Sequence, residues 1–332
     1  MIGQRSATVE RADFVGRRPL RWSSSRSADR AFEGVAAAFA ASIVLLVILI
    51  GIELWHGSHL ARREFGLGFI TEQTWDPVHA VFGAAPFIYG TVLTSLIALL
   101  LAAPLGIGTA IFLILLAPGW LRPTVGFLVE MLAAIPSVIY GLWALFVLVP
   151  IVRSDVEPFL KRTFGFLPLF QGPAYGVGYL ASALVLTIMI LPTITAVSQA
   201  VLYTVPRAQL EGAYAIGATR WEVITGVALP FARSGIFGAT ILGLGRALGE
   251  TMAVTMVIGN RAEIGTSLFA LGHTMAAVIA NQFNEADNDL YVSALIEIGL
   301  ILFVVSILLN LAARGLVWRM GGRSGAAEMR RA

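Results

Sequence analysis

Two charged side chains, Arg246 and Glu250, stand four residues apart in an otherwise apolar stretch, GLGRALGETMAVTMVIGN, residues 243–260. In a continuous helix this spacing places both side chains on one face. A guanidinium group offers a planar fork of donors that fits an oxyanion, and it keeps its charge at any working pH. A charge at the middle of a membrane costs at least about 2.5–3.5 kcal/mol on insertion scales. The pair therefore predicts either a site that contacts an anion or an ion pair that holds helices together.

Further polar residues stand in or beside apolar stretches and could belong to the same site. Glu130 and Glu297 could share Arg246 in ion pairs between helices. Glu250 is expected to hold Arg246 in place and to weaken the site enough for an anion to leave. These acids outnumber the one arginine, so composition alone does not indicate an anion. The candidate residues of a substrate path are Arg246, Glu250, Thr251, Asn260, Glu130 and Glu297, and Thr251 could equally bond to its own helix backbone.

The composition predicts an all-α, polytopic membrane protein. Of the 332 residues, 57% are apolar and only 13% are charged, and the mean hydropathy is +0.81. A soluble domain carries roughly 25% charged residues. Cysteine is absent, which excludes disulfides and thiolate metal sites. His56 and His59 have no third ligand beside them, so we expect no metal site.

The chain is not expected to be an enzyme. A P-loop requires Gly-Lys-Ser/Thr, and the one lysine, Lys161, lies between Leu160 and Arg162. No Ser–His–Asp constellation stands in the apolar stretches, so we predict no catalytic residues. No cofactor is expected in this chain.

Six stretches are long and apolar enough to cross a bilayer, which takes about 20 residues. They cover residues of about 35–55, 87–117, 123–150, 178–203, 233–258 and 289–317. Proline falls inside three of them, at Pro104, Pro136 and Pro192. The shorter stretch 267–280, which carries His273, is predicted to be a re-entrant or interfacial helix.

The distribution of Lys and Arg indicates that both termini are cytoplasmic. With six spans, sixteen of these residues fall on the side of the termini and six on the other side. Cytoplasmic loops carry the excess of basic residues. We therefore interpret residues 1–32 as an Arg-rich cytoplasmic tail rather than a nucleic-acid-binding arm, and residues 316–332 as a second cytoplasmic tail.

The predicted cytoplasmic segment between the fourth and fifth spans is too long for a simple connection. It reads VPRAQLEGAYAIGATRWEVITGVALPFARSG, residues 205–235. Pro206 suits a first helical turn, and Gly217 suits a helix end. Thr219 with Glu222 three residues later has the pattern of a capping box. Two short helices are therefore expected at the membrane surface.

This segment resembles the EAA signature of ABC importer permeases, E-A-A-x3-G-x9-I-x-L-P. Glu211, Gly217, Leu229 and Pro230 stand at the family spacing, whereas Gly212 replaces an alanine and Val227 an isoleucine. In that family the signature forms coupling helices that dock in a groove of an ATPase subunit. The resemblance thus implies a coupling segment over residues 205–232, with contact residues Glu211, Gly212, Ala213, Gly217, Leu229 and Pro230.

Two further stretches, VEMLAAIPSVIYGLW at residues 129–143 and GRALGETMAVTMVIGN at residues 245–260, resemble phosphate-specific ABC importer permeases of the PstC type. The resemblance implies a type-I ABC importer permease fold with its core at residues 87–315, after a first span and outer loop at residues 33–86. It also implies a bacterial plasma (inner) membrane protein that imports inorganic phosphate. The implied partners are a sister permease of the PstA type, two ATPase subunits that carry ATP and Mg²⁺, and an extracytoplasmic phosphate-binding protein.

Two alternatives remain open at this stage. The cargo could be another oxyanion such as molybdate or sulfate, although a carboxylate could accept a hydrogen bond from protonated phosphate and so reject ionised sulfate. The chain could also be a proton-coupled secondary transporter with Glu130, Glu250 and Glu297 as a relay. This second alternative leaves the cytoplasmic segment 205–235 without a role.

Overall fold

The computed structural model describes residues 26–328, which form two compact units, one ending at Ile50 and one beginning at Gly51. The boundary between the units falls within α1 (Arg26–Gly57), which starts inside the predicted tail 1–32, whose earlier residues lie outside the described range. The apolar side chains of α1 from Ile43 to Ile50 are exposed. In the second unit, α15 (Asp289–Glu328) continues as a helix into the predicted tail 316–332.

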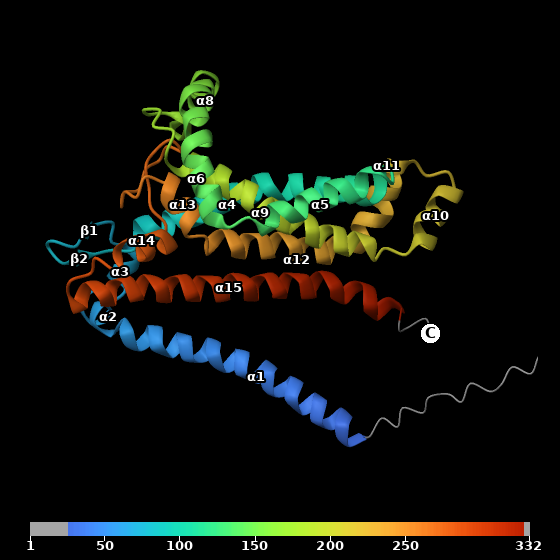
Figure 1. Ribbon diagram of the computed structural model, residues 1–332, viewed down its shortest axis with the longest axis horizontal. Helices are drawn as coiled ribbons and strands as arrows, with labels where there is room; N and C mark the ends of the chain where they lie inside the picture. Colours follow the sequence, from blue (N-terminus) through green and yellow to red (C-terminus); the bar gives the residue numbers. More distant parts are fainter. Residues whose placement is uncertain (1–25, 329–332) are drawn as a thin grey trace, which may run out of the picture. The chain divides into compact units, whose positions relative to one another are not determined.

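The second unit is almost wholly helical (Figure 1). Six helical segments in the described chain are long and apolar enough to cross a membrane, at residues 29–57, 85–116, 137–164, 179–203, 220–248 and 289–312. The other elements between α1 and α15 are α2 (His59–Phe65), α3 (Gly68–Thr71), β1 (Trp75–Asp76), β2 (Val81–Phe82), α4 (Ala85–Ile111), η1 (Phe112–Leu116), α5 (Leu121–Ala134), α6 (Ser137–Trp143), η2 (Ala144–Leu148), α7 (Val149–Ile151), η3 (Val152–Val156), α8 (Glu157–Phe164), η4 (Pro168–Phe170), α9 (Tyr179–Tyr203), α10 (Arg207–Ala215), α11 (Arg220–Val223), η5 (Ile224–Ala228), α12 (Leu229–Leu248), α13 (Met252–Val257) and α14 (Met275–Gln282).

Four of the η segments are π-helical turns, and each ends two residues before a proline. They are η1, η2, η3 and η5, which precede Pro118, Pro150, Pro158 and Pro230. Proline has no N–H, and its ring collides with the carbonyl four residues back in an α-helix. In each case the residue before the proline donates instead to the carbonyl five residues back, as Leu229 does to Ile224. At η2, η3 and η5 the helix continues through its proline, so residues 137–164 and 220–248 each form one long helix.

The third predicted span, 123–150, is wrong in its boundaries. The helix stops at Ala134, because Ile135 and Pro136 take extended backbone angles, and a new helix runs from Ser137 to Phe164. Figure 1 shows its last part, α8, directed away from the neighbouring helices. The connection to α9 therefore begins after Phe164 rather than after residue 150. Pro104 and Pro192 do lie inside helices, as predicted.

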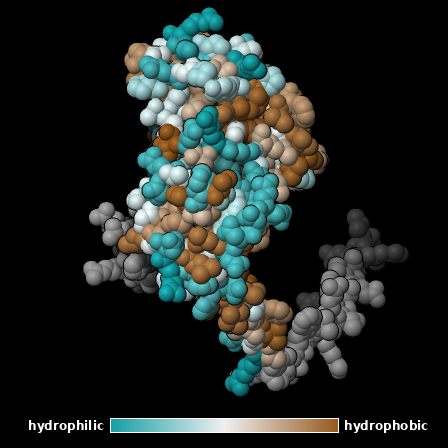
Figure 2. Space-filling model, turned by 90° about the vertical axis from the view of Figure 1, so that its left-hand side faces the viewer, coloured by the Kyte–Doolittle hydropathy of each residue, from teal (hydrophilic) through white to brown (hydrophobic). Residues whose placement is uncertain are grey.

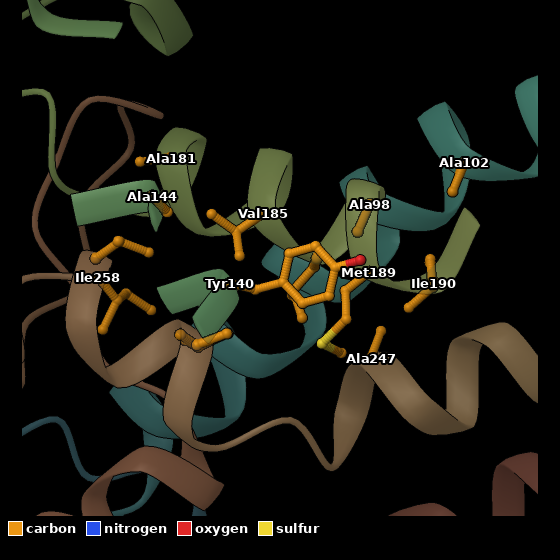
Figure 3. Packing of buried hydrophobic residues seen from close by; sticks show 14 of the residues in the cluster. Ala98, Ala102, Tyr140, Ala144, Ala181, Val185, Met189, Ile190, Ala247 and Ile258 are labelled. Atoms are coloured by element: carbon orange, nitrogen blue, oxygen red, sulfur yellow. The ribbon is translucent and has the colours of Figure 1, made fainter. Parts of the chain in front are cut away.

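The core of the second unit is built around α9, which packs against α4 and α12. Small side chains such as Ala98, Ala102 and Ala181 let the helices approach closely (Figure 3). The larger residues between them, including Tyr140 and Met189, fill the remaining space. Gly243 is required for the same reason, because a Cβ there would lie 2.7 Å from the Ile194 side chain.

One end of the second unit consists of loops, a short hairpin and short helices (Figure 1). The β1–β2 hairpin, which the all-α prediction did not include, pairs Trp75 with Phe82 in an aromatic cluster with Phe87 and Tyr291. Figure 2 looks onto this end, where hydrophilic side chains gather between apolar flanks. The stretch 267–280 belongs here, and it is no span. Its helical part, α14, starts only at Met275 and is buried along its first turn.

Candidate functional site

The predicted coupling segment forms one separate helix, α10, with well-defined ends. It starts directly after Pro206. At its far end Gly217 has φ +92, which favours glycine. Gly217 N–H donates to the Tyr214 carbonyl at 3.0 Å, and Ala218 N–H donates to the Ala213 carbonyl at 3.1 Å. This is the Schellman pattern of bonds. The predicted role of Gly217 as a helix end is confirmed.

The outward face of α10 carries the signature residues, while Leu210 anchors its inner face. Leu210 packs against a cluster that contains Leu202, Ala228 and Ala232. Glu211 and Gly212 are exposed, and Ala213 is half-buried. A Cβ added at Gly212 would meet no atom within 4 Å, so nothing in this chain requires glycine there.

The second short helix predicted for this segment is not a separate element. The capping box is present as predicted, with Glu222 N–H donating to Thr219 Oγ1 at 3.4 Å and Thr219 N–H donating to Glu222 at 2.8 Å. The helix that it starts, however, continues through η5 into α12, because the π-turn accommodates Pro230. Leu229 and Pro230 therefore lie within the fifth long helix, and Leu229 packs against the same buried cluster as Leu210 of α10.

Arg246 and Glu250 do not share a helix face, so that part of the prediction is wrong. The helix α12 ends at Leu248, and the next helix, α13, starts at Met252. The non-helical residues from Gly249 to Thr251 form a break between the two helices. Glu250 lies in this break and accepts a hydrogen bond from the Ala253 N–H at 3.1 Å. Within the described chain no ion pair joins the two side chains. The carboxylate supports the start of α13 instead of neutralising the arginine.

Arg246 lies in the last turn of α12 with an exposed side chain. Its Nη1 donates to Thr193 Oγ1 on α9 at 3.2 Å. Ala247, its neighbour, is buried in the core beside Tyr140 and Met189 (Figure 3). The backbone at Arg246 is thus fixed by packing, while most of the guanidinium donors stay available to a ligand.

Thr251 and Asn260, which were predicted to lie in the substrate path, donate hydrogen bonds to nearby backbone carbonyls instead. Thr251 Oγ1 donates to the carbonyl of Gly249, two residues earlier, at 3.3 Å. Asn260 has φ +52, and its Nδ2 donates to the Thr255 carbonyl at 3.0 Å. These contacts shape the segment after the break without bringing either residue to Arg246.

The structure does not gather Glu130 and Glu297 around Arg246. Glu297 is buried on α15, where its Oε2 has no hydrogen-bond partner among the described residues. Glu130 is exposed on α5 and lines a cavity with Gln199 and Tyr203 of α9.

Sequence reasoning missed Thr193, Gln199 and Tyr203, which all lie on α9. The available signal was their polarity inside the apolar stretch 178–203. Their positions beside Arg246 and Glu130 depend on how α9 packs against α12 and α5.

Comparison with known proteins assigns this architecture to a family. The model of the family of binding-protein-dependent transport system inner membrane components matches residues 102–322. The chain belongs to this family, and it is a transport component with several membrane-spanning helices.

Curated relatives match nearly the whole chain. The phosphate transport system permease protein PstC of Mesorhizobium japonicum is 52% identical over 293 residues, covering 86% of this chain and 90% of that protein. The protein of the same name from Xylella fastidiosa is 43% identical over 302 residues, covering 90% of this chain and 93% of that protein.

Solved structures share the fold at low sequence identity. A chain of a bacterial alginate ABC transporter, solved with an alginate-bound periplasmic protein, aligns with a TM-score of 0.58 at 18% identity, covering 89% of this chain and 97% of that one. A chain of the MetNI methionine ABC transporter aligns with a TM-score of 0.52 at 18% identity, covering 70% of this chain and 94% of that one. The predicted type-I ABC permease fold is confirmed.

Proposed function

We propose that this chain is the PstC-type membrane subunit of an ATP-driven importer of inorganic phosphate. The observation that carries the proposal is the pair of relatives named phosphate transport system permease proteins, which match along most of the chain. An arginine that faces open space at a helix break, with donors to spare, supports an anionic cargo.

The proposal includes partners that the chain needs for transport. A sister permease of the PstA type completes the path, and a phosphate-binding protein delivers the ion from outside. Two ATPase subunits bind ATP and Mg²⁺, since this chain has no P-loop lysine. Both termini and α10 lie on the cytoplasmic side of the bacterial plasma membrane, where the exposed Glu211 and Gly212 meet an ATPase.

Alternating access is driven from α10 in this proposal. Leu210 of α10 packs against a cluster that includes Ala228 and Ala232, which belong to the same continuous helix as Arg246. A displacement of α10 by the ATPase is therefore transmitted along residues 220–248 to the guanidinium. In this proposal α10 packs near one end of this long helix, and Arg246 lies near its other end.

Phosphate uptake by the complete complex in proteoliposomes tests the proposal, with ATP enclosed and an uncoupler present. Arg246→Glu is expected to lower uptake about 100-fold, because attraction becomes repulsion at the ligand. Arg63→Glu, a matched reversal at an exposed position on α2, should leave uptake unchanged. Undiminished uptake by an assembled Arg246→Glu complex would overturn the role of Arg246.

The same preparation separates the rival functions. Unlabelled phosphate should compete with labelled phosphate, and sulfate should not. Efficient competition by sulfate would favour an importer of another oxyanion. Uptake that collapses with the uncoupler, while ATP is held constant, would favour a proton-coupled secondary transporter.

A further inference from the structure

Polar and small residues line one exposed face of α9 between Arg246 and the end that carries α10. The face contains Thr193, Ala196, Ala200 and Tyr203, which follow one another at spacings of three and four residues. Ala196, Ala200 and Tyr203 are exposed, whereas the opposite side of the helix is buried in the core. At a rise of 1.5 Å per residue, the face runs for roughly 15 Å from Thr193 to Tyr203.

A first cavity of about 250 Å³ opens on this face between α5 and α9. Its polar lining consists of Glu130, Gln199 and Tyr203. Gln199 Nε2 is enclosed and has no hydrogen-bond partner in the described part of the chain. A buried amide without a partner is costly, which indicates a group that a ligand or water satisfies.

A second cavity of about 550 Å³ continues toward α10. Its charged lining residues are Arg122, Arg207 and Glu211. Ile114 and Tyr203 line both cavities, so the two spaces adjoin at the Tyr203 side chain. Along the face, the charge is positive at Arg246 and negative at Glu130, and it is positive on balance in the second cavity, where Arg122 and Arg207 outweigh Glu211.

We propose that the two adjoining cavities form the release track by which the oxyanion leaves Arg246, with Tyr203 at the junction between them. The inference rests on the proposed function and extends it from the contact at Arg246 to the exit. Hydrogen phosphate fits the first cavity, because its bare oxygens accept from Gln199 and Tyr203 while its P–OH donates to Glu130. Fully ionised sulfate has no proton to offer to the carboxylate.

The alternation of charge explains how the track conducts instead of trapping its ion. A path must bind its ion well enough to admit it and weakly enough to release it. Glu130 repels the anion and keeps its stay in the first cavity short. Arg122 and Arg207 then attract it toward the wider second cavity.

The absence of cysteine allows a direct test in the complete complex, since a single introduced thiol is the only one in this subunit. Ala196→Cys and Ala200→Cys place a thiol on the track. Leu100→Cys is the matched control, because Leu100 is a 71% exposed residue on the apolar face of α4. The probe is a sulfonate-bearing methanethiosulfonate reagent, and the mass shift of this subunit measures its reaction.

We expect both track thiols to react at least about tenfold faster than the control, because a charged reagent does not enter an apolar environment. Inorganic phosphate should slow the reaction at Ala200→Cys. Adding Glu130→Gln should lower the phosphate concentration that gives half-protection several-fold, whereas adding the exposed change Glu53→Gln should not.

The outcomes distinguish this inference from the proposed function. Track thiols that react as slowly as the control, in variants that still import phosphate, would overturn the track and leave the function intact. Rapid reaction with protection by sulfate and not by phosphate would overturn the phosphate assignment and retain the track. An unchanged half-protection concentration in the Glu130→Gln variant would overturn the role of Glu130.

Discussion

The two halves of α9 have opposite surroundings although they belong to one apolar helix. From Tyr179 to Thr195 nearly every side chain is buried, and the loop after α13 seals the start of the helix. Tyr179 N–H donates to the Ala270 carbonyl at 3.1 Å, and Leu180 N–H donates to the Leu268 carbonyl at 2.9 Å. From Ala196 to Tyr203, by contrast, one face opens onto two cavities.

The change between the closed and the open half occurs at the level of Arg246, which contacts Thr193. Hydropathy therefore does not decide whether a segment of this chain is buried on all sides. Packing by neighbouring loops and helices decides it. The closed half should therefore be sensitive to added volume and buried charge, and the open half should be sensitive to changes that affect partners.

The largest effect is expected on α4, at the point where it packs beside the closed half of α9. A Cβ on Gly90 of α4 would lie 2.0 Å from the His273 carbonyl oxygen, whereas a Cβ on Gly108 of the same helix would meet no atom within 4 Å. Gly90→Ala should lower stability by about 3 kcal/mol because backbone atoms must shift. Gly108→Ala should change it by less than about 1 kcal/mol. Thermal unfolding of the purified subunit in detergent measures both, and equal midpoints would contradict the comparison.

A second effect concerns a buried titratable group at the same end. His273 is buried beside Phe87, and its Nδ1 accepts the Thr274 N–H at 3.1 Å. Burial lowers the pKa of His273 from its ordinary 6.5 to about 4. In the unfolded chain His273 therefore becomes protonated below about pH 6.5, whereas in the folded chain it stays neutral down to about pH 4. The free energy of unfolding is unaffected by this group above pH 6.5, and it decreases as the pH falls from 6.5 toward 4.

Between pH 7 and pH 5 this loss should amount to about 2 kcal/mol. Unfolding midpoints at the two pH values test it. The stability change between the two pH values in His273→Gln should differ from that of the unmodified subunit by about this amount, and His59→Gln, a change at an exposed histidine, should retain the unmodified pH dependence. A His273→Gln variant with the full pH dependence would show that another group is responsible.

The smallest effect is expected at the surface that α10 presents. Glu211→Arg reverses an exposed charge at the proposed ATPase contact and should weaken co-purification of the ATPase at least about tenfold, or 1.4 kcal/mol. Gln209→Arg, at another exposed position of α10, should weaken it less. The fold should be unaffected in both variants, because neither side chain is buried. Equal retention of the ATPase by both would argue against Glu211 as a contact.

Most of the architecture followed from the sequence because apolar length and local capping leave strong signals. The six spanning helices, the end of α10 at Gly217 and the capping box at Thr219 are all local properties. The helix boundaries near prolines could not be predicted as well from the sequence. Pro136 interrupts a helix whereas Pro192 does not, and no difference in local composition distinguishes the two.

The candidate site was predicted less well for a related reason. A spacing of four residues brings Arg246 and Glu250 together only in an unbroken helix, and the break at Gly249 separates their roles. The cavities beside Gln199 and Tyr203 depend on where α5 lies, which is a tertiary property. The sequence identified the arginine, and the packing supplied its neighbours.

The π-turns before the prolines also alter the angular phase of the helices that contain them. Each π-turn inserts one extra residue, so the side chains beyond it are rotated relative to a regular 3.6-residue repeat. Residues 137–164 contain two such insertions, and residues 220–248 contain one, ahead of Arg246. The direction in which Arg246 points is therefore set in part at Ile224–Ala228, five helical turns away, by the need to accommodate a proline.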